Sequence, residues 1–431
     1  MVDGGVRPAE DAGTQPRYRQ PRDTLTVHDD RLRAAPDAVG EAGTGSPTPP
    51  LPPARSRGGW TRLGVASAVV GGSLVRGDVA VHDGEIVAVG LPGRGAGIAA
   101  PGLVDTQVNG YAGVDVLDAE PDALLAMGKA LLRDGVLAYV PTLITSELGR
   151  LRRAAQRIAD TTRATGGNSG GAAILGIHLE GPFLSPARPG THPVERLRAP
   201  DTALLEELLD FGDIRVVTLA PELEGALALV VACRRRGVVV SLGHSAADAS
   251  HAAAGFAAGA TAVTHLYNAM EPLLARAPGL AGTALATDGV TVQVIADGVH
   301  VADEMIRLAF QAARGRCSLV SDTIAAAGIG DCEVRLGEVV VVVKDGVARR
   351  ADGTLAGSVG KLRDGLVRIR RLGIAPLDAL DAVTSRPARL VGSSRYGELA
   401  VGGPADLLVL DDELAIERVV VGGREIDLDQ P

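Results

Sequence analysis

Hydrophobic residues in the long middle part of this sequence gather in short continuous runs. Most runs are separated by Ala-, Leu- and Arg-rich segments of helical periodicity, such as 122–135 and 246–260. Strands that are apolar at consecutive positions are buried on both faces, which is typical of parallel sheets. Eight strand–helix units close naturally into a barrel, so the pattern predicts an α/β fold with a TIM-like (β/α)8 barrel. The eight runs cover residues 101–108, 137–144, 172–179, 214–221, 237–244, 260–267, 290–297 and 317–323.

An open doubly wound sheet is the alternative, and it is disfavoured because no GxGxxG turn follows the first run. The two ends of the chain have a different pattern. Residues 78–90 show a strand, an Asp-Gly turn and a second strand, and residues 397–426 are short β runs broken by Gly, Pro and acidic turns. We therefore expect a small β-sandwich built from both chain ends.

The expected domain boundaries follow from these patterns. Residues 58–100 and 389–431 form the sandwich, and residues 101–388 form the barrel. Residues 1–57 are rich in Pro, Gly, Arg and Asp and have almost no apolar periodicity, which predicts a disordered tail. A wrongly assigned start codon would produce the same pattern.

Composition narrows the class of protein. Of the 431 residues 46% are hydrophobic, which is enough for a large core, and the net charge of -9 argues against nucleic-acid binding. Three scattered cysteines suggest neither a disulfide framework nor a thiolate metal site, so we expect a reducing cytoplasm. No apolar run approaches the ~20 residues needed to cross a bilayer, and the start of the chain lacks a secretory signal.

Polar side chains interrupt the apolar runs near the carboxyl ends of the predicted strands. Burying an unpaired carboxylate such as Glu180 costs several kcal/mol, so a partner is required. In a barrel these strand ends converge on one mouth, and His244 and His265 offer nitrogen ligands that would complete a divalent metal site with Glu180. The residues at these positions are Glu180, His244, His265, His300 and Asp322.

Each residue also has a simpler interpretation. A lone histidine at a strand end is more often structural than a ligand, Glu180 alone could cap a helix or pair with an arginine, and Asp322 could be the N-cap of a helix over "TIAAAG". These alternatives weaken jointly, because five of the eight histidines lie in or beside the same loops: His178, His192, His244, His265 and His300. A structural role is expected for His28, His82 and His251.

Eight motifs occur in an order that resembles a known family. They are "APGLVDTQVNGYAGVDV", "GIHLEGPFLS", "GTHP", "LGHSAA", "THLYNAMEPLLARAPGLAG", "ADGVHV", "LVSDTIAAAG" and "DGTLAGS". Together they resemble the N-acetylglucosamine-6-phosphate deacetylases of the amidohydrolase superfamily, over residues 60–428. The family fold is a TIM-like barrel with a sandwich from both chain ends, which agrees with the pattern above.

The resemblance implies a role for each matching residue. Glu180, His244 and His265 would bind one divalent ion, zinc or iron, and Asp322 would be the catalytic acid and base. Contacts to the sugar phosphate would come from His192, Asn268, the backbone of Ala269, His300, Leu355, Ala356 and Gly357. Arg276 would reach the phosphate from the neighbouring subunit of a homodimer. The implied reaction converts N-acetylglucosamine 6-phosphate into glucosamine 6-phosphate and acetate.

Several positions depart from the common pattern or raise a question. Gln107 and Asn109 stand where amidohydrolases with two metals carry His-x-His, which indicates a single-metal site. Thr323 stands where alanine is common. Gly360, Lys361 and Leu362 replace the usual continuation after Ser358, close to the expected sugar pocket, and Glu271 is expected to point away from the phosphate. No chemical role is assigned to His178.

Two other functions stay open from the sequence alone. One is a deacetylase of another acylated amino sugar, such as N-acetylgalactosamine 6-phosphate, which would keep every metal residue. The other is a sugar-phosphate-binding protein without catalysis, against which the full set Glu180, His244, His265 and Asp322 argues.

Overall fold

The computed structural model describes residues 59–165 and 170–428. The predicted disordered tail at residues 1–57 lies outside the described residues. None of the helices in the described ranges has the length and apolar character needed to cross a membrane.

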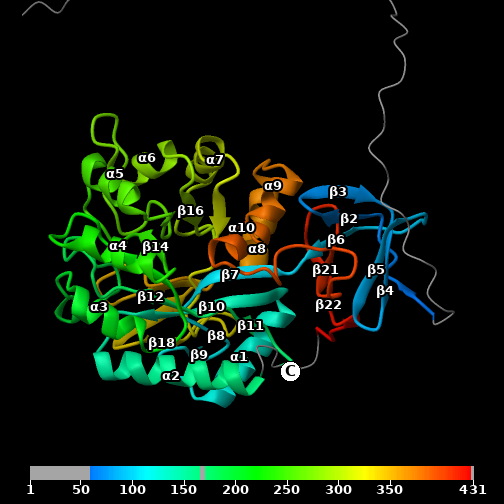
Figure 1. The fold of residues 1–431 in the computed structure, drawn as a ribbon, viewed down its shortest axis with the longest axis horizontal. Coiled ribbons are helices and arrows are strands. Elements are labelled where there is room, and N and C mark those ends of the chain that lie inside the picture. The colour runs from blue at the N-terminus through cyan, green and yellow to red at the C-terminus, as the bar shows by residue number, and fades with distance from the viewer. Residues whose placement is uncertain (1–58, 166–169, 429–431) are drawn as a thin grey trace, which may run out of the picture. The chain divides into compact units, whose positions relative to one another are not determined.

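Eight parallel strands in the described ranges form the barrel and lie in chain order around its wall, with several of them labelled in Figure 1. Each corresponds to one of the eight apolar runs, so the predicted barrel is confirmed. The strands are β7 (Leu103–Val108), β10 (Val136–Ile144), β12 (Ile177–Glu180), β13 (Ile214–Leu219), β14 (Val239–Leu242), β15 (Ala262–Val263), β16 (Thr291–Val294) and β17 (Cys317–Leu319). A short strand, β11 (Ala173–Ile174), pairs with the beginning of β10.

The barrel closes between β17 and β7 through the residues that follow β17. Val108 and Thr323 form a parallel bridge, and the backbone N–H of Asp322 donates to the carbonyl of Gln107 at 3.0 Å. The backbone N–H of Ser321 donates to the buried carboxylate of Asp105 at 3.2 Å. Closure therefore runs through the segment that carries Asp322, which fixes this residue at the mouth.

Helices cover the outside of the strands. Their apolar residues recur every three or four positions and are buried against the barrel, as at Leu124, Met127 and Leu131 in the first helix. Asp201 and Asp248 cap two of them by accepting backbone N–H bonds. The helices are α1 (Pro121–Arg133), α2 (Leu148–Thr165), α3 (Thr202–Leu209), α4 (Ala226–Arg235), α5 (Ala249–Ala258), α6 (Gly279–Ala286), α7 (Asp303–Ala312), α8 (Leu362–Arg371), α9 (Pro376–Asp381) and α10 (Ser385–Leu390), with a 3-10 turn at Val194–Arg196.

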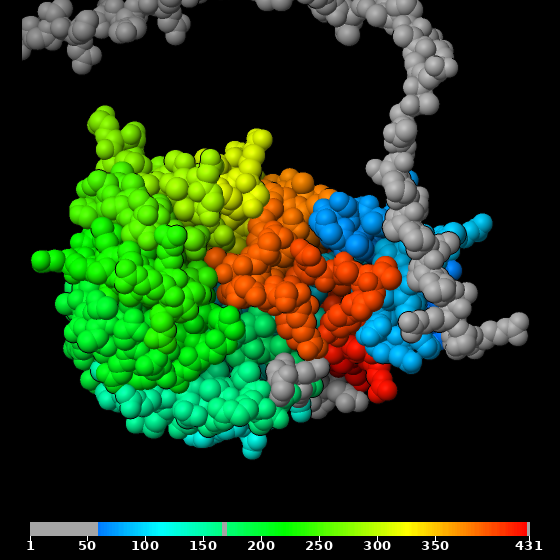
Figure 2. Space-filling view, in the orientation of Figure 1, coloured from blue at the N-terminus to red at the C-terminus, as the bar shows by residue number. Residues whose placement is uncertain are grey.

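The two chain ends form the predicted sandwich. One sheet has the order β23-β22-β21-β6-β2-β3 and the other β1-β4-β5, and valine, leucine and alanine side chains from both pack between them. In Figure 2 the blue and red residues lie together. The strands are β1 (Thr61–Arg62), β2 (Ser67–Val70), β3 (Ser73–Arg76), β4 (Asp78–His82), β5 (Glu85–Leu91), β6 (Ile98–Pro101), β21 (Leu407–Leu410), β22 (Ile416–Val421) and β23 (Arg424–Glu425). The predicted boundary after residue 388 falls within α10. We propose the domain boundaries as given in the sequence analysis.

An antiparallel sheet of three strands follows the last barrel strand, and the strand pattern above does not include it. We call residues 333–349 the flap; its strands are β18 (Glu333–Leu336), β19 (Val339–Lys344) and β20 (Val347–Arg349). Its buried face packs on Ile144, Ile324 and Ala356. Another short hairpin, β8 (Gly110–Tyr111) with β9 (Val114–Asp115), follows the first barrel strand.

Candidate active site

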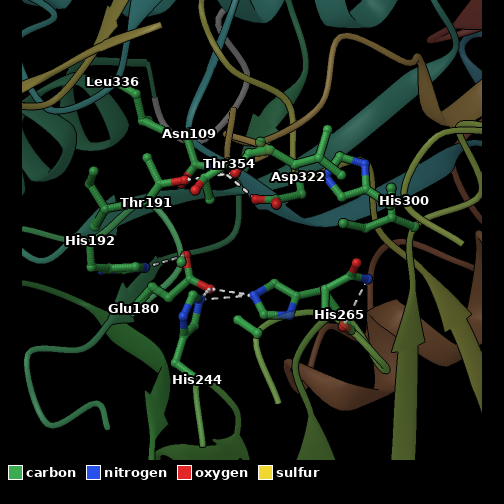
Figure 3. Close-up of a pocket in the computed structure, with 17 residues that line it drawn as sticks. Asn109, Glu180, Thr191, His192, His244, His265, His300, Asp322, Leu336 and Thr354 are labelled. Atoms are coloured by element: carbon green, nitrogen blue, oxygen red, sulfur yellow. Dashed lines mark hydrogen bonds and ion pairs between the residues drawn. The ribbon is translucent and has the colours of Figure 1, made fainter. Parts of the chain in front are cut away.

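A cavity of about 290 Å³ opens at the carboxyl ends of the barrel strands (Figure 3). Most of the residues singled out from the sequence line it. The lining residues are Asn109, Ile144, Glu180, Gly190, Thr191, His192, His244, His265, Asn268, Ala269, Ile295, His300, Asp322, Leu336, Thr354, Leu355 and Gly357.

Glu180, His244 and His265 point toward one another at the floor of this cavity. Oε1 of Glu180 lies 3.1 Å from Nε2 of His265 and 3.3 Å from Nε2 of His244, and the two ring nitrogens are 3.0 Å apart. All three side chains are buried. Glu180 is the last residue of β12, whereas His265 was expected inside its strand and in fact follows β15 by two residues.

The electrostatics suit a cation at this point. Burial raises the pKa of Glu180, but contacts with His192, His244 and His265 outweigh this and hold it well below its usual range. Burial lowers the pKa of His244 to about 4, so its ring is neutral at pH 7. Its Nδ1 donates to the carbonyl oxygen of Arg188 at 3.1 Å, which leaves a lone pair on Nε2 facing the other two groups. One carboxylate and two imidazoles are a ligand set that fits a divalent metal.

The backbone is strained at the same place. Non-glycine residues rarely adopt positive φ, and those that do cluster at functional sites. Of the nine such residues in the described ranges, five lie in the segments that form the cavity: His244, His265, Tyr267, Ala269 and Asp322.

Asp322 lies across the cavity from the proposed metal ligands. Nδ2 of Asn109 donates to its Oδ1 at 2.7 Å. Burial and the nearby charge of Glu180 raise the pKa of Asp322 to about 7. Residues 325–329 form turns and no helix begins after Asp322, so the N-cap alternative is wrong.

Two further histidines face the cavity in defined orientations. Nδ1 of His192 lies 3.3 Å from the backbone nitrogen of Thr145 and 2.9 Å from its Oγ1, contacts that fix the plane of the ring. Nδ1 of His300 donates to Oδ2 of Asp297 at 2.7 Å. His178 is different, because its two ring nitrogens bond to Thr142 (3.3 Å) and Thr218 (2.7 Å) inside the barrel.

Of the remaining predicted contacts, Asn268, Ala269, Leu355 and Gly357 line the cavity. Ala356 does not: its side chain is fully buried beneath the flap. Arg276 also lies outside the lining. It is exposed at the tip of a tight turn in which Leu274 and Ala277 pair. Their roles in substrate binding stay predictions.

Three of the positions that depart from the family pattern or raise a question make defined hydrogen bonds in the structure. Nε2 of Gln107 donates to Oε1 of Glu180 at 3.0 Å. Nζ of Lys361 donates to Asp134 at 3.0 Å, which directs it to the end of α1. Arg188 donates to Glu271 at 3.0 and 2.7 Å, so this carboxylate is paired.

Sequence reasoning assigned no role to several residues of the site. Asp297 stands three positions before His300, and this spacing in "ADGVH" was the signal for the pair. Thr191, whose hydroxyl donates to the carbonyl of Leu355 at 3.3 Å, lies next to His192. Leu336 and Thr354 reach the cavity from the flap and the segment after it, and nothing in the sequence pattern indicated this.

The histidines expected to be structural agree with that expectation where they are described. His82 pairs with Asp83, and His251 on α5 pairs with Asp248, both at the surface. His28 lies outside the described residues.

The chain is similar to known proteins over most of its length. The profile of the amidohydrolase family matches residues 98–426. An N-acetylgalactosamine-6-phosphate deacetylase of Escherichia coli O157:H7 is 38% identical, over 79% of this chain and 90% of its own length. An N-acetylglucosamine-6-phosphate deacetylase of Bacillus subtilis is 33% identical, over 81% and 92%. Among solved structures, a mutant N-acetyl-D-glucosamine-6-phosphate deacetylase of Mycobacterium smegmatis in complex with N-acetyl-D-glucosamine-6-phosphate has a TM-score of 0.79 and 34% identity, over 85% of this chain and 99% of its own.

Proposed function

This chain belongs to the amidohydrolase family, and from that premise we propose that it hydrolyses N-acetyl-D-glucosamine 6-phosphate to D-glucosamine 6-phosphate and acetate. One observation carries the proposal most directly. Glu180, His244 and His265 converge on one point of a buried cavity that also contains Asp322, a carboxyl group whose pKa is raised toward neutrality. A metal-ligand set beside a general base is an arrangement that can hydrolyse an amide.

Glu180, His244 and His265 would hold a single divalent ion, and the nitrogen and oxygen donors suit zinc or iron. When bound, such an ion supplies a Lewis acid that polarises the amide carbonyl and lowers the pKa of water. Gln107 and Asn109 support a single ion, because their side chains bond to Glu180 and Asp322 and they replace the His-x-His pair of a second site.

Asp322 accepts the proton of the attacking water and then returns it to the amine nitrogen, since an amine leaves poorly without protonation. A pKa near 7 serves both steps, because the carboxylate is a stronger base than an ordinary aspartate and the acid can still donate. Asn109 fixes the plane of the carboxylate through its bond to Oδ1. Nε2 of His192, 3.7 Å from Oε2 of Glu180, would donate to the carbonyl oxygen as negative charge develops there.

Substrate contacts follow from the cavity lining. We assign the sugar to His300, Leu355 and Gly357, and the phosphate to Asn268 and the backbone of Ala269. Arg276 would bind the phosphate in the neighbouring subunit of a homodimer, since it is exposed and does not line its own cavity. We propose a cytoplasmic location, with which the three free cysteines are consistent.

A second substrate is also supported by one observation. The relative from Escherichia coli O157:H7 is named for N-acetylgalactosamine 6-phosphate, which differs only at one sugar hydroxyl. The metal ligands and Asp322 would serve both epimers equally, so discrimination lies with the sugar contacts.

The test is an acetate-release assay on the purified full chain. Both epimers are supplied with and without the 6-phosphate, and bound metal is determined on the same preparation. We expect turnover of N-acetylglucosamine 6-phosphate that disappears on chelation and returns on adding zinc or iron. No acetate release from that substrate by a metal-loaded, folded protein would refute the proposal, and a strong preference for the galactose epimer would favour the second substrate.

A further inference from the structure

The flap places one apolar side chain in the cavity. Leu336 is the last residue of β18 and is only 4% exposed, yet it lines the cavity. In Figure 3 it lies beside Asn109, and His300 lies on the opposite side of Asp322. Ile144, which lines the same cavity and packs with Leu336, is the residue paired with Glu180 in the sheet register.

The tip of the flap is fastened to the barrel, so Leu336 is held in place. The backbone N–H of Gly337 donates to the half-buried carboxylate of Asp115 at 2.9 Å. Glu338 accepts from Ser146 at 3.3 Å and from Arg196 at 3.2 Å. The flap therefore cannot move away from a larger ligand without breaking these three contacts.

The position of the reacting amide indicates which part of the substrate would face Leu336. Its carbonyl carbon must lie within reach of both Asp322 and the proposed metal ligands, which places the amide bond across Asp322. The sugar is attached to the nitrogen, and His300, one of its assigned contacts, lies on one side of Asp322 (Figure 3). The acyl substituent leaves the carbonyl carbon in the other direction, toward Leu336 and Ile144.

We propose that Leu336, together with Ile144, forms the wall of an acyl pocket that accepts an acetyl group and excludes longer acyl chains. The proposal rests on the deacetylase function above and adds the residue that sets its acyl-length specificity. A hydrophobic pocket discriminates one methylene by roughly 10- to 200-fold in kcat/KM, so a single leucine is sufficient for this task.

The experiment measures kcat/KM for N-acetyl-, N-propionyl- and N-butyrylglucosamine 6-phosphate. We expect the wild type to lose at least about 10-fold with each added methylene. Leu336→Ala should lower the acetyl rate and raise the butyryl-to-acetyl ratio by about 10-fold or more. Leu336→Val, which removes one methylene and spares the fold, should raise the propionyl-to-acetyl ratio by a smaller factor.

Val341→Ala is the matched control. Val341 lies in β19 of the flap, packs in the same hydrophobic cluster as Leu336 and is fully buried, but it does not line the cavity. It should lower the melting temperature and leave the acyl ratios at their wild-type values.

The outcomes distinguish a failure of the acyl pocket from a failure of the deacetylase function. Wild-type turnover of the acetyl substrate with unchanged acyl ratios in both Leu336 variants would overturn the acyl pocket and leave the deacetylase function standing. Equal ratio changes in Val341→Ala would also overturn it, because they would indicate general loosening of the flap. No turnover of any acyl substrate by the wild type would refute the function and this inference with it.

Discussion

Asp297→Asn tests whether the orientation of His300 matters to the reaction. Oδ1 of Asp297 accepts the backbone N–H groups of Val299 and His300 at 2.9 Å each, and Oδ2 accepts from Nδ1 of His300 at 2.7 Å and from Ser358 at 3.1 Å. An asparagine keeps its oxygen on the two backbone groups and places an NH2 group opposite His300. That NH2 donates to Nδ1, so this ring nitrogen can no longer carry a proton directed at residue 297.

The size of the effect follows from the burial of the pair. The side chains of Asp297 and His300 are each only 7% exposed, so the lost bond is not replaced by water. Burial opposes the charge of Asp297, yet bonds and charge from His300 hold the pKa of this carboxyl well below its usual range. Hydrogen bonds to charged groups contribute about 1.5–3 kcal/mol. If the substrate requires the native orientation, kcat/KM falls by about 10- to 100-fold, at 1.4 kcal/mol for each factor of ten.

The assay follows kcat and KM for the phosphorylated substrate together with bound metal. Metal content should stay at the wild-type value, because His300 is not among the proposed ligands. Asp248→Asn is the matched control: Asp248 holds Nδ1 of His251 at 2.8 Å with the same spacing, but on the surface of α5. Wild-type kcat/KM in Asp297→Asn, or the same loss in Asp248→Asn, would contradict the argument.

Three further predictions concern the same site. Asp322→Asn should keep its metal while kcat falls by about 10²- to 10⁴-fold, since an amide cannot accept the proton of water; near-normal kcat would remove Asp322 from the mechanism. Because the pKa of Asp322 is raised to about 7 and its carboxylate is the active base, kcat/KM should fall as the pH decreases through that range. Asn109→Ala removes a hydrogen bond that lowers this pKa, so it should shift the inflection upward; an unchanged pH profile in that variant would argue against an effect of Asn109 on Asp322. Arg276→Ala should raise KM for the 6-phosphorylated sugar and barely affect the unphosphorylated one, with the dimer checked by solution mass; equal losses on both sugars, or an active monomer, would contradict this assignment.

The sequence predicted the barrel because its strands are buried on both faces and therefore read as continuous apolar runs. It also singled out Glu180, His244 and His265, which the structure brings together, since a carboxylate or histidine at the end of such a run is costly to bury in an apolar core without a partner. Strand ends were less certain. "ATAVTHLY" is apolar enough to predict a strand through His265, but pairing in β15 stops at Val263, where the backbone turns.

The hydrophobic pattern of the sequence did not predict the flap, and the reason is physical. Its strands alternate buried and exposed positions, with Val340 and Val342 exposed and Val341 and Val343 buried, but all of these residues are valine. The sequence therefore has no period of two from which to read a half-exposed strand. The approach of Leu336 to the cavity depends on long-range contacts, such as that of Gly337 with Asp115, which local patterns do not encode.

Below the strained backbone at the mouth of the barrel lies a layer of hydrogen-bonded threonine and serine side chains. His244 and His265 have φ values of 47° and 30°, conformations that cost of order 1–3 kcal/mol each. Directly beneath them, Thr264 bonds to Thr218 at 2.7 Å and to Ser241 at 2.6 Å. These side chains are fully buried, and such a network resists displacement because each member would leave an unpaired polar group. The barrel interior thereby holds the two ring nitrogens and Glu180 within 3.3 Å of one another. A cation that binds this prearranged set must stabilise the folded chain, so chelation should lower the melting temperature as well as activity.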